Sequence, residues 1–261
     1  MELSISRYCV LVVKWLSRLP VTEEIAGSNP VEHAKILFSK KLQKFLLHLP
    51  PMHDFHAQLH KQTYDALADE YESRVETFRA VTERALQPFI NALPQNAKIL
   101  DVGCAVGYTV EILQQYQHVV EGIDISPEMI AHARHRNPQS TFVVADFLEH
   151  PYKVESFDGA LLYAFLHLFP KQTAIQVMSK VTTVLKPGGF IFIGTTKSAE
   201  ASEGFEEKAD YSSNEKRYRK RWTQMELETL FEELGLKVIH YEDNTDEFGK
   251  VWMDYVVQKA K

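Results

Sequence analysis

The chain has 261 residues, of which 45% are hydrophobic, enough to form one full hydrophobic core with a small appendage. Its 29 basic residues stand against 35 acidic ones, and the formal net charge of −6 argues against a general nucleic-acid-binding surface while allowing a local basic patch. Two cysteines, Cys9 and Cys104, exclude a disulfide framework and fit a cytoplasmic protein, and no apolar run approaches the roughly 20 residues that span a membrane.

Residues 1–51 form an atypical N-terminal extension without a clear helical or strand period. One reading frame of the T-arm of a tRNA gene encodes the string Gly27-Ser-Asn-Pro30, so we interpret the extension as translated tRNA sequence with the genuine start near Met52. A genuine extension, disordered or loosely docked, is the alternative. Within it, Ala34 to Leu49 has the pattern of a basic amphipathic helix, which would rest on the domain or bind a membrane surface or a partner.

Residues 52–95 are expected to form a helical cap. Three histidines are spaced so that they share one helix face: His53, His56 and His60. A metal site would need a fourth ligand, so we expect solvated histidines and no metal. Tyr64 and Tyr71 follow in the pattern Y-D-x-x-A-x-x-Y, and a second helix is predicted from Val75 to Ala92.

The segment from Lys98 to Thr109 holds the most informative pattern of the chain. A short apolar strand carries Asp101, and Gly103 and Gly107 lie in the turn before a helical pattern. A strand, a glycine turn and a helix start bring backbone N–H groups close to a ligand. The spacing differs from the dinucleotide fingerprint G-x-G-x-x-G, and Asp101 would repel a pyrophosphate, so a nicotinamide enzyme is not expected.

Further strands follow in an alternating α/β order. One ends at Asp124, about 20 residues after the glycine turn, where a carboxylate can accept hydrogen bonds from both ribose hydroxyls. Ser126 and Pro127 are typical of a helix N-cap and first helical position. A third strand is expected to end at 145–147, and residues 156–168 are expected to hold a fourth strand and the turn after it. The turn Leu-Lys-Pro-Gly-Gly closes a helix at 187–189 and opens a fifth strand.

Together these segments, from Ile99 to Thr196, resemble the class I S-adenosylmethionine-dependent methyltransferases. The glycine turn is similar to the motif D/E-x-G-x-G-x-G, with Ala105 in place of the middle glycine, and the Leu-Lys-Pro-Gly-Gly turn is a further hallmark. The resemblance implies a doubly wound, mostly parallel seven-stranded α/β sheet of Rossmann-like type over residues 96–261. Helices would cover both faces, and the last strand would be antiparallel.

The resemblance also implies S-adenosylmethionine as the cofactor. Asp101 and the glycine turn would hold its methionine end with the cap tyrosines, Asp124 the ribose, and Asp146 with Phe147 the adenine. The residues expected to bind the cofactor are Tyr64, Tyr71, Asp101, Gly103, Cys104, Ala105, Gly107, Asp124, Ile125, Met129, Ala145, Asp146, Phe147 and Tyr163.

Direct methyl displacement depends mainly on alignment and needs no metal, but some acceptors need a base. His167 follows the fourth strand and is the candidate base, with a packing histidine as the alternative. The Asn/Asp-Pro-Pro-Tyr signature of amino-methyltransferases acting on nucleic-acid bases is absent, so we expect no DNA partner.

A polar insertion, Lys197 to Trp222, is the expected lid. Five cations and two aromatics crowd its end, from Lys216 to Trp222, where arginines suit a carboxylate or phosphate on the acceptor. The alternatives are contact with RNA, or a solvated lid balanced by its own glutamates. After it, a capping box at Thr223 predicts a helix from Met225 to Leu234, and Val238–Glu242 and Val251–Val257 predict an antiparallel pair.

A small-molecule methyltransferase is therefore the expected function. The alternatives are a methyltransferase acting on RNA or protein through the basic lid, and an inactive regulatory protein that binds the cofactor. The acceptor atom and the oligomeric state stay open.

Overall fold

The computed structural model describes residues 52–207, 211, 216–246 and 249–261. The extension 1–51, including the helix expected from Ala34 to Leu49, lies outside these residues. The chain divides into two compact units, Met1–Phe55 and His56–Lys261, and every site described below lies in the second. Within the described residues, no helix is long and apolar enough to cross a membrane.

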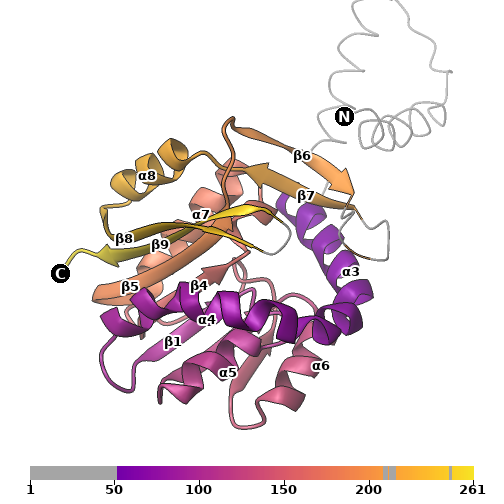
Figure 1. Ribbon diagram of the computed structural model, residues 1–261, viewed down its shortest axis with the longest axis horizontal. Helices are drawn as coiled ribbons and strands as arrows, with labels where there is room; N and C mark the ends of the chain where they lie inside the picture. Colours follow the sequence, from indigo (N-terminus) through magenta and orange to yellow (C-terminus); the bar gives the residue numbers. More distant parts are fainter. Residues whose placement is uncertain (1–51, 208–210, 212–215, 247–248) are drawn as a thin grey trace, which may run out of the picture. The chain divides into compact units, whose positions relative to one another are not determined.

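Seven strands form the main sheet: β1 (Lys98–Val102), β2 (Val119–Asp124), β3 (Thr141–Val144), β4 (Phe157–Tyr163), β5 (Leu185–Thr196), β8 (Leu236–Thr245) and β9 (Val251–Lys259). Their order is β3-β2-β1-β4-β5-β9-β8 (Figure 1). The strands from β3 to β5 pair in parallel, whereas β9 is antiparallel to both of its neighbours. The predicted fold class, with its antiparallel last strand, is confirmed.

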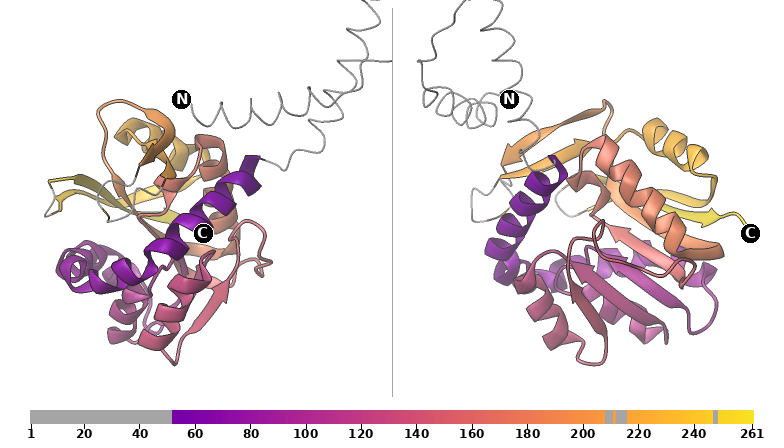
Figure 2. Two further views of the ribbon diagram at one scale, coloured as in Figure 1. Left: turned by 90° about the vertical axis from the view of Figure 1, so that its right-hand side faces the viewer. Right: turned by 180° about the vertical axis from the view of Figure 1, so that it is seen from behind.

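The helices are α3 (Met52–Ser73), α4 (Val75–Ala92), α5 (Tyr108–Gln115), α6 (Pro127–Arg136), α7 (Lys171–Val184) and α8 (Gln224–Glu233), with a 3₁₀ turn η1 (Leu166–Leu168). They cover both faces of the sheet (Figure 2). Side chains of α7 and α8 pack with Leu100 and Ile191, whereas α4, α5 and α6 pack with Ile99 and Phe192. Because neighbouring residues of a strand point to opposite faces of the sheet, each buried strand contributes side chains to the hydrophobic core on both faces.

Two predicted helix starts are confirmed at the level of single hydrogen bonds. The Ser126 hydroxyl accepts a bond of 3.1 Å from the Met129 N–H at the start of α6. At the start of α8, Thr223 and Glu226 form the predicted capping box. These caps satisfy N–H groups that the first helical turn leaves without a partner in the helix.

Two strand boundaries differ from expectation. β3 ends at Val144, because the Asp146 carboxylate accepts a hydrogen bond of 2.8 Å from the Leu148 N–H and turns the chain there. The Leu-Lys-Pro-Gly-Gly segment lies within β5, which begins at Leu185, directly after α7 ends at Val184. A register shift between Phe157 and Gly159 on β4 accommodates the glycines.

The expectation of solvated histidines on the cap helix is wrong for His56 and His60, which are both buried. The His56 ring stacks on Phe205 at 5.5 Å between centroids, and His60 Nε2 lies 2.7 Å from the Leu168 carbonyl oxygen. No group of three possible His, Cys, Asp or Glu ligands for a metal ion occurs in the described part of the chain.

The predicted lid contains a two-stranded hairpin, β6 (Ser202–Glu207) and β7 (Lys216–Arg221). The expectation that this insertion is too polar for the core is wrong for its end, because Trp222 is fully buried and Arg217 and Lys220 are nearly so. Lys220 is held by the Glu226 carboxylate at 2.9 Å. Paired cations with long aliphatic stems can therefore pack inside a domain.

Candidate active site

The glycine turn between β1 and α5 brings the main chain to the carboxyl edge of the sheet. Gly103 and Ala105 have φ values of 75° and 45°, in the left-handed region. A side chain at Gly103 would place its Cβ 2.2 Å from the Phe165 ring, so this position needs glycine for both conformation and space. The N–H of Gly103 donates to the Ile123 carbonyl at 2.8 Å, which fixes the turn against β2.

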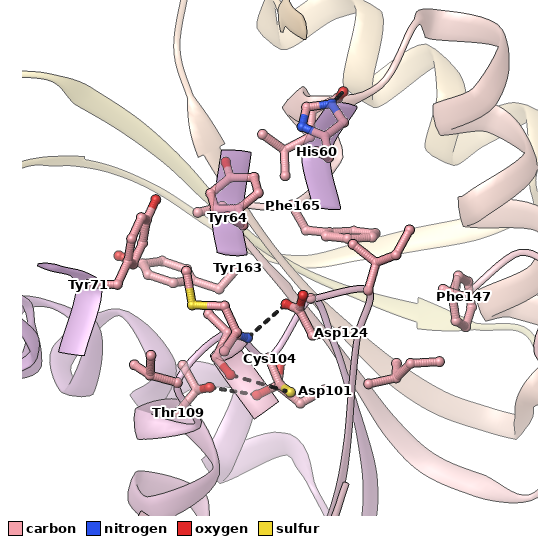
Figure 3. A pocket seen from close by; sticks show the side chains of 18 of the residues that line it. His60, Tyr64, Tyr71, Asp101, Cys104, Thr109, Asp124, Phe147, Tyr163 and Phe165 are labelled. Carbon is pink, nitrogen blue, oxygen red and sulfur yellow. Dashed lines mark hydrogen bonds between the residues drawn. The ribbon is translucent and has the colours of Figure 1, made fainter. Parts of the chain in front are cut away.

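Asp124 closes this turn from the end of β2. Its carboxylate accepts a hydrogen bond from the N–H of Ala105 at 3.0 Å, which Figure 3 shows, and a second one from the N–H of Ser126 at 2.9 Å. Burial raises the pKa of Asp124 to about 6, and these backbone bonds oppose the rise. With this pKa the carboxyl is mostly ionised near neutral pH, and its oxygens can accept hydrogen bonds from hydroxyl donors such as those of a ribose.

Asp101 lies deeper, at the end of β1, and is 2% exposed. It accepts a hydrogen bond of 2.5 Å from the Thr109 hydroxyl (Figure 3). Burial, with a smaller contribution from the charge of Asp124, raises the pKa of Asp101 to about 7, although the Thr109 hydrogen bond opposes the rise. Two buried carboxyls facing one cavity attract a cationic ligand, which would favour their ionised forms.

One pocket brings together thirteen of the fourteen residues predicted to bind the cofactor. Tyr71 and Phe147 lie at its two ends in Figure 3, with Asp101 and Asp124 between them. The exception is Gly107, which is not among the lining residues. Gly107 instead allows close helix packing. Its φ is 74°, and a Cβ placed there would lie 2.9 Å from side-chain atoms of Ala133 and Asn137, so a larger residue would not fit.

Sequence reasoning missed several lining residues, and His60 and Phe165 are the most informative of these. Burial lowers the pKa of His60 to about 4, so the imidazole is neutral. His60 stands one helical turn before Tyr64, and Phe165 stands two residues after Tyr163, so proximity to the predicted residues was the available signal.

A second pocket adjoins the first and shares its lining of Tyr64, Tyr71, Phe78, Tyr108, Tyr163 and Ala164. The candidate base His167 lines this second pocket and not the first. Its Nδ1 lies 3.1 Å from the Thr195 hydroxyl, and its ring is buried. Arg217 and Arg219 of the lid also line this pocket. The predicted base and lid cations thus line a second pocket, and the predicted cofactor residues Tyr64, Tyr71 and Tyr163 stand between the two pockets.

A sheet of this order, with a glycine turn after β1 and acids at the ends of β1 and β2, has the fold of the class I S-adenosylmethionine-dependent methyltransferases. Residues 99–189 match the protein family described as a methyltransferase domain. The chain therefore carries a domain of this family, whose methyl donor is S-adenosylmethionine.

Two solved structures illustrate the likeness in fold. A Methanosarcina mazei S-adenosylmethionine-dependent methyltransferase has a TM-score of 0.60 at 21% identity, over 67% of this chain and 97% of that one. The Burkholderia thailandensis 1,6-didemethyltoxoflavin-N1-methyltransferase, solved with its substrate and S-adenosylhomocysteine, has a TM-score of 0.59 at 20% identity, over 82% of this chain and 92% of that one.

The curated relatives act on different acceptors. A tRNA (carboxymethyluridine(34)-5-O)-methyltransferase of Arabidopsis thaliana is 29% identical over 54% of this chain and 33% of its own length. A ubiquinone biosynthesis O-methyltransferase of Xanthomonas axonopodis pv. citri is 30% identical over 42% of this chain and 47% of its own length. The chain thus spans a third to a half of the relatives it matches.

Proposed function

We propose that the protein transfers the methyl group of S-adenosylmethionine to a small-molecule acceptor by direct displacement. The observation that carries this proposal is the pair of adjoining pockets, which share aromatic walls and differ in chemistry. The first holds the buried acid Asp101 and the half-buried acid Asp124, and the second holds His167 and arginines. A donor and an acceptor can therefore be bound side by side in surroundings that exclude water.

The residues of the first pocket fit the cofactor. The buried Asp101 carboxyl would pair with the ammonium of the methionine end, and the Asp124 carboxylate would accept hydrogen bonds from the ribose hydroxyls. Ala145, Asp146 and Phe147 would flank the adenine. Bound S-adenosylmethionine supplies an electrophilic methyl carbon on a positively charged sulfur. Holding the acceptor nucleophile in line with that bond is the main task of the chain.

His167 is proposed to take a proton from the acceptor when its nucleophile carries one. The Thr195 hydroxyl at Nδ1 fixes the orientation of the imidazole, and the ring stands 6.2 Å from that of Trp252. A histidine held in this way at the wall of an enclosed pocket is well placed for general base catalysis.

Calorimetric titration of the full chain with S-adenosylmethionine, S-adenosylhomocysteine and NAD tests the cofactor assignment. We expect the first two to bind in the micromolar range and NAD not to bind. Binding of neither sulfur compound would contradict the proposal. Tight binding without turnover against a broad panel of acceptors would instead favour an inactive regulatory protein.

Action on RNA is the second candidate, because the relatives include RNA methyltransferases and β7 is rich in cations. The side chains of Arg217 and Arg219 are only 7% and 11% exposed, which supports a small acceptor over a polyanion surface. RNA binding that falls steeply with salt, and is lost when Arg217, Arg219 and Arg221 are neutralised together, would favour RNA. A cytoplasmic location stays a prediction.

A further inference from the structure

The second pocket, hereafter the acceptor pocket, concentrates buried positive charge. We propose that it binds an acceptor with a planar ring and an anionic group, a carboxylate or a phosphate, held by the guanidinium groups of Arg217 and Arg219. This inference rests on the proposed methyltransferase function and names the chemical class of its acceptor.

Three arginines of β7 share one carboxylate. Glu206 lies 3.2 Å from Arg217, 3.6 Å from Arg219 and 2.8 Å from Arg221. Among the described residues, these three guanidinium groups therefore share one carboxylate, and the side chains of the first two arginines are largely shielded from water. Burial and the neighbouring charge of Arg217 lower the pKa of Arg219, as expected for incompletely balanced positive charge.

Cations outnumber acids among the described residues that line the acceptor pocket. Four cationic side chains line it: Arg217, Arg219, Lys250 and Arg74, the last of which pairs with Glu70. Asp246 is the acid among the described lining residues, and its carboxylate accepts hydrogen bonds from Trp252 Nε1 at 2.9 Å and from the Lys250 N–H at 2.8 Å. An anion on the acceptor would complete the balance, and guanidinium forks match a carboxylate or a phosphate.

Aromatic side chains give the acceptor pocket flat walls. Tyr163 stacks on Trp252 with 5.5 Å between ring centroids, and Tyr71 stacks on Tyr211 at 4.7 Å. The guanidinium of Arg74 covers the Tyr211 ring at 4.3 Å. Stacked aromatic walls favour a planar ligand over a branched or flexible one.

Two neighbouring residues of β5 position Arg219, which is expected to bind the anion, and His167, the candidate base. Arg219 Nη2 donates a hydrogen bond of 2.7 Å to the Thr196 hydroxyl, and His167 contacts the Thr195 hydroxyl. Because consecutive residues of one buried strand hold them, the separation of the two groups is fixed by the sheet. An acceptor anchored by its anion would therefore present its other atoms in a defined position relative to His167.

The test uses the full chain saturated with S-adenosylhomocysteine, titrated calorimetrically with three probes of similar shape: benzoate, phenyl phosphate and benzamide. We expect one or both anions to bind at least about tenfold more tightly than neutral benzamide. The anion that binds with the higher affinity shows whether the pocket prefers a carboxylate or a phosphate. Equal binding of all three probes would overturn the proposal without using any variant.

Two matched variants locate the effect. Arg219→Gln should abolish the preference for the anions, whereas Arg221→Gln should keep it, because Arg221 contacts the same glutamate but does not line the pocket. Anion preference retained in Arg219→Gln would contradict the proposal. So would weaker S-adenosylhomocysteine binding in that variant, since the guanidinium would then serve the carboxylate of the cofactor. If S-adenosylhomocysteine fails to bind the wild-type chain, the proposed function itself has failed.

Discussion

The carboxylate of Asp124 accepts a hydrogen bond of 3.0 Å from the backbone N–H of Ala105. The acid expected at the ribose therefore also holds the turn expected around the methionine end. Ala105 has a φ of 45°, which a residue with a side chain adopts only when its surroundings impose it. We infer that Asp124 contributes this constraint, so the parts of the pocket expected to hold the ribose and the methionine end depend on one side chain.

Substituting Asp124 should therefore weaken the binding of the cofactor. We expect Asp124→Ala to weaken S-adenosylhomocysteine binding by about 1–3 kcal/mol, the scale of a lost hydrogen bond to a charged group. Asp124→Asn keeps an oxygen for the Ala105 N–H and should lose less. Calorimetry on both variants measures the difference, and an unchanged affinity of Asp124→Ala would remove this residue from the ribose assignment.

Cofactor affinity should depend on pH through Asp101. Its pKa of about 7 in the empty pocket means that the carboxyl is largely protonated at a pH near 6 and ionised near 8. An ammonium group binds the ionised form, so affinity for S-adenosylhomocysteine should rise across this range, with release of protons on binding. Asp101→Asn should bind more weakly and with a flatter pH profile. Affinity that falls with rising pH in the wild type would exclude the pairing.

His60 should make the fold sensitive to acid. Burial lowers its pKa from 6.5 to about 4, so the unfolded chain binds more protons than the folded one between these values. Stability from this group is complete above pH 6.5 and is lost as the pH falls towards 4. His60→Gln can still donate to the Leu168 carbonyl and should lose less stability between pH 7 and pH 5 in thermal melts. Parallel melting curves of the two proteins would contradict this assignment.

Gly103→Ala should damage both the fold and the cofactor pocket. The left-handed backbone alone costs about 1–2 kcal/mol for a residue with a Cβ, and the new methyl group would meet the Phe165 ring. Adding Phe165→Ala should restore only part of the stability, because the backbone cost remains. Denaturant unfolding separates the two contributions, and full rescue by the second substitution would show that the clash alone matters.

His167→Gln is expected to slow methyl transfer about 10²–10⁴-fold, with any acceptor whose nucleophile must lose a proton. Because His167 lines the acceptor pocket and not the cofactor pocket, S-adenosylhomocysteine binding should be unchanged. A merely structural histidine would show the reverse pattern, with a lower melting temperature and an unaltered pH profile of the rate.

The sequence was most informative where the signal is local. Asp101, Asp124 and Ser126 could be placed because strand ends and helix caps leave patterns within a few residues. His60 could not be placed, because its partner is the carbonyl of Leu168, more than a hundred residues away. For Arg217 the sequence left two interpretations open, an anion-binding side chain or part of a solvated lid, since a run of charges does not reveal which of them fold inward.

The antiparallel direction of β9 has a consequence for the order in which the site is made. The parallel strands end at the carboxyl edge, but β9 begins there, so Trp252 reaches the acceptor pocket while Tyr255 and Val256 enter the core. During synthesis, the turn at Gly103 and the acids of the cofactor pocket emerge from the ribosome long before this strand. A nascent chain that stops short of β9 would thus contain the sequence for donor binding but neither a finished core nor a closed acceptor wall.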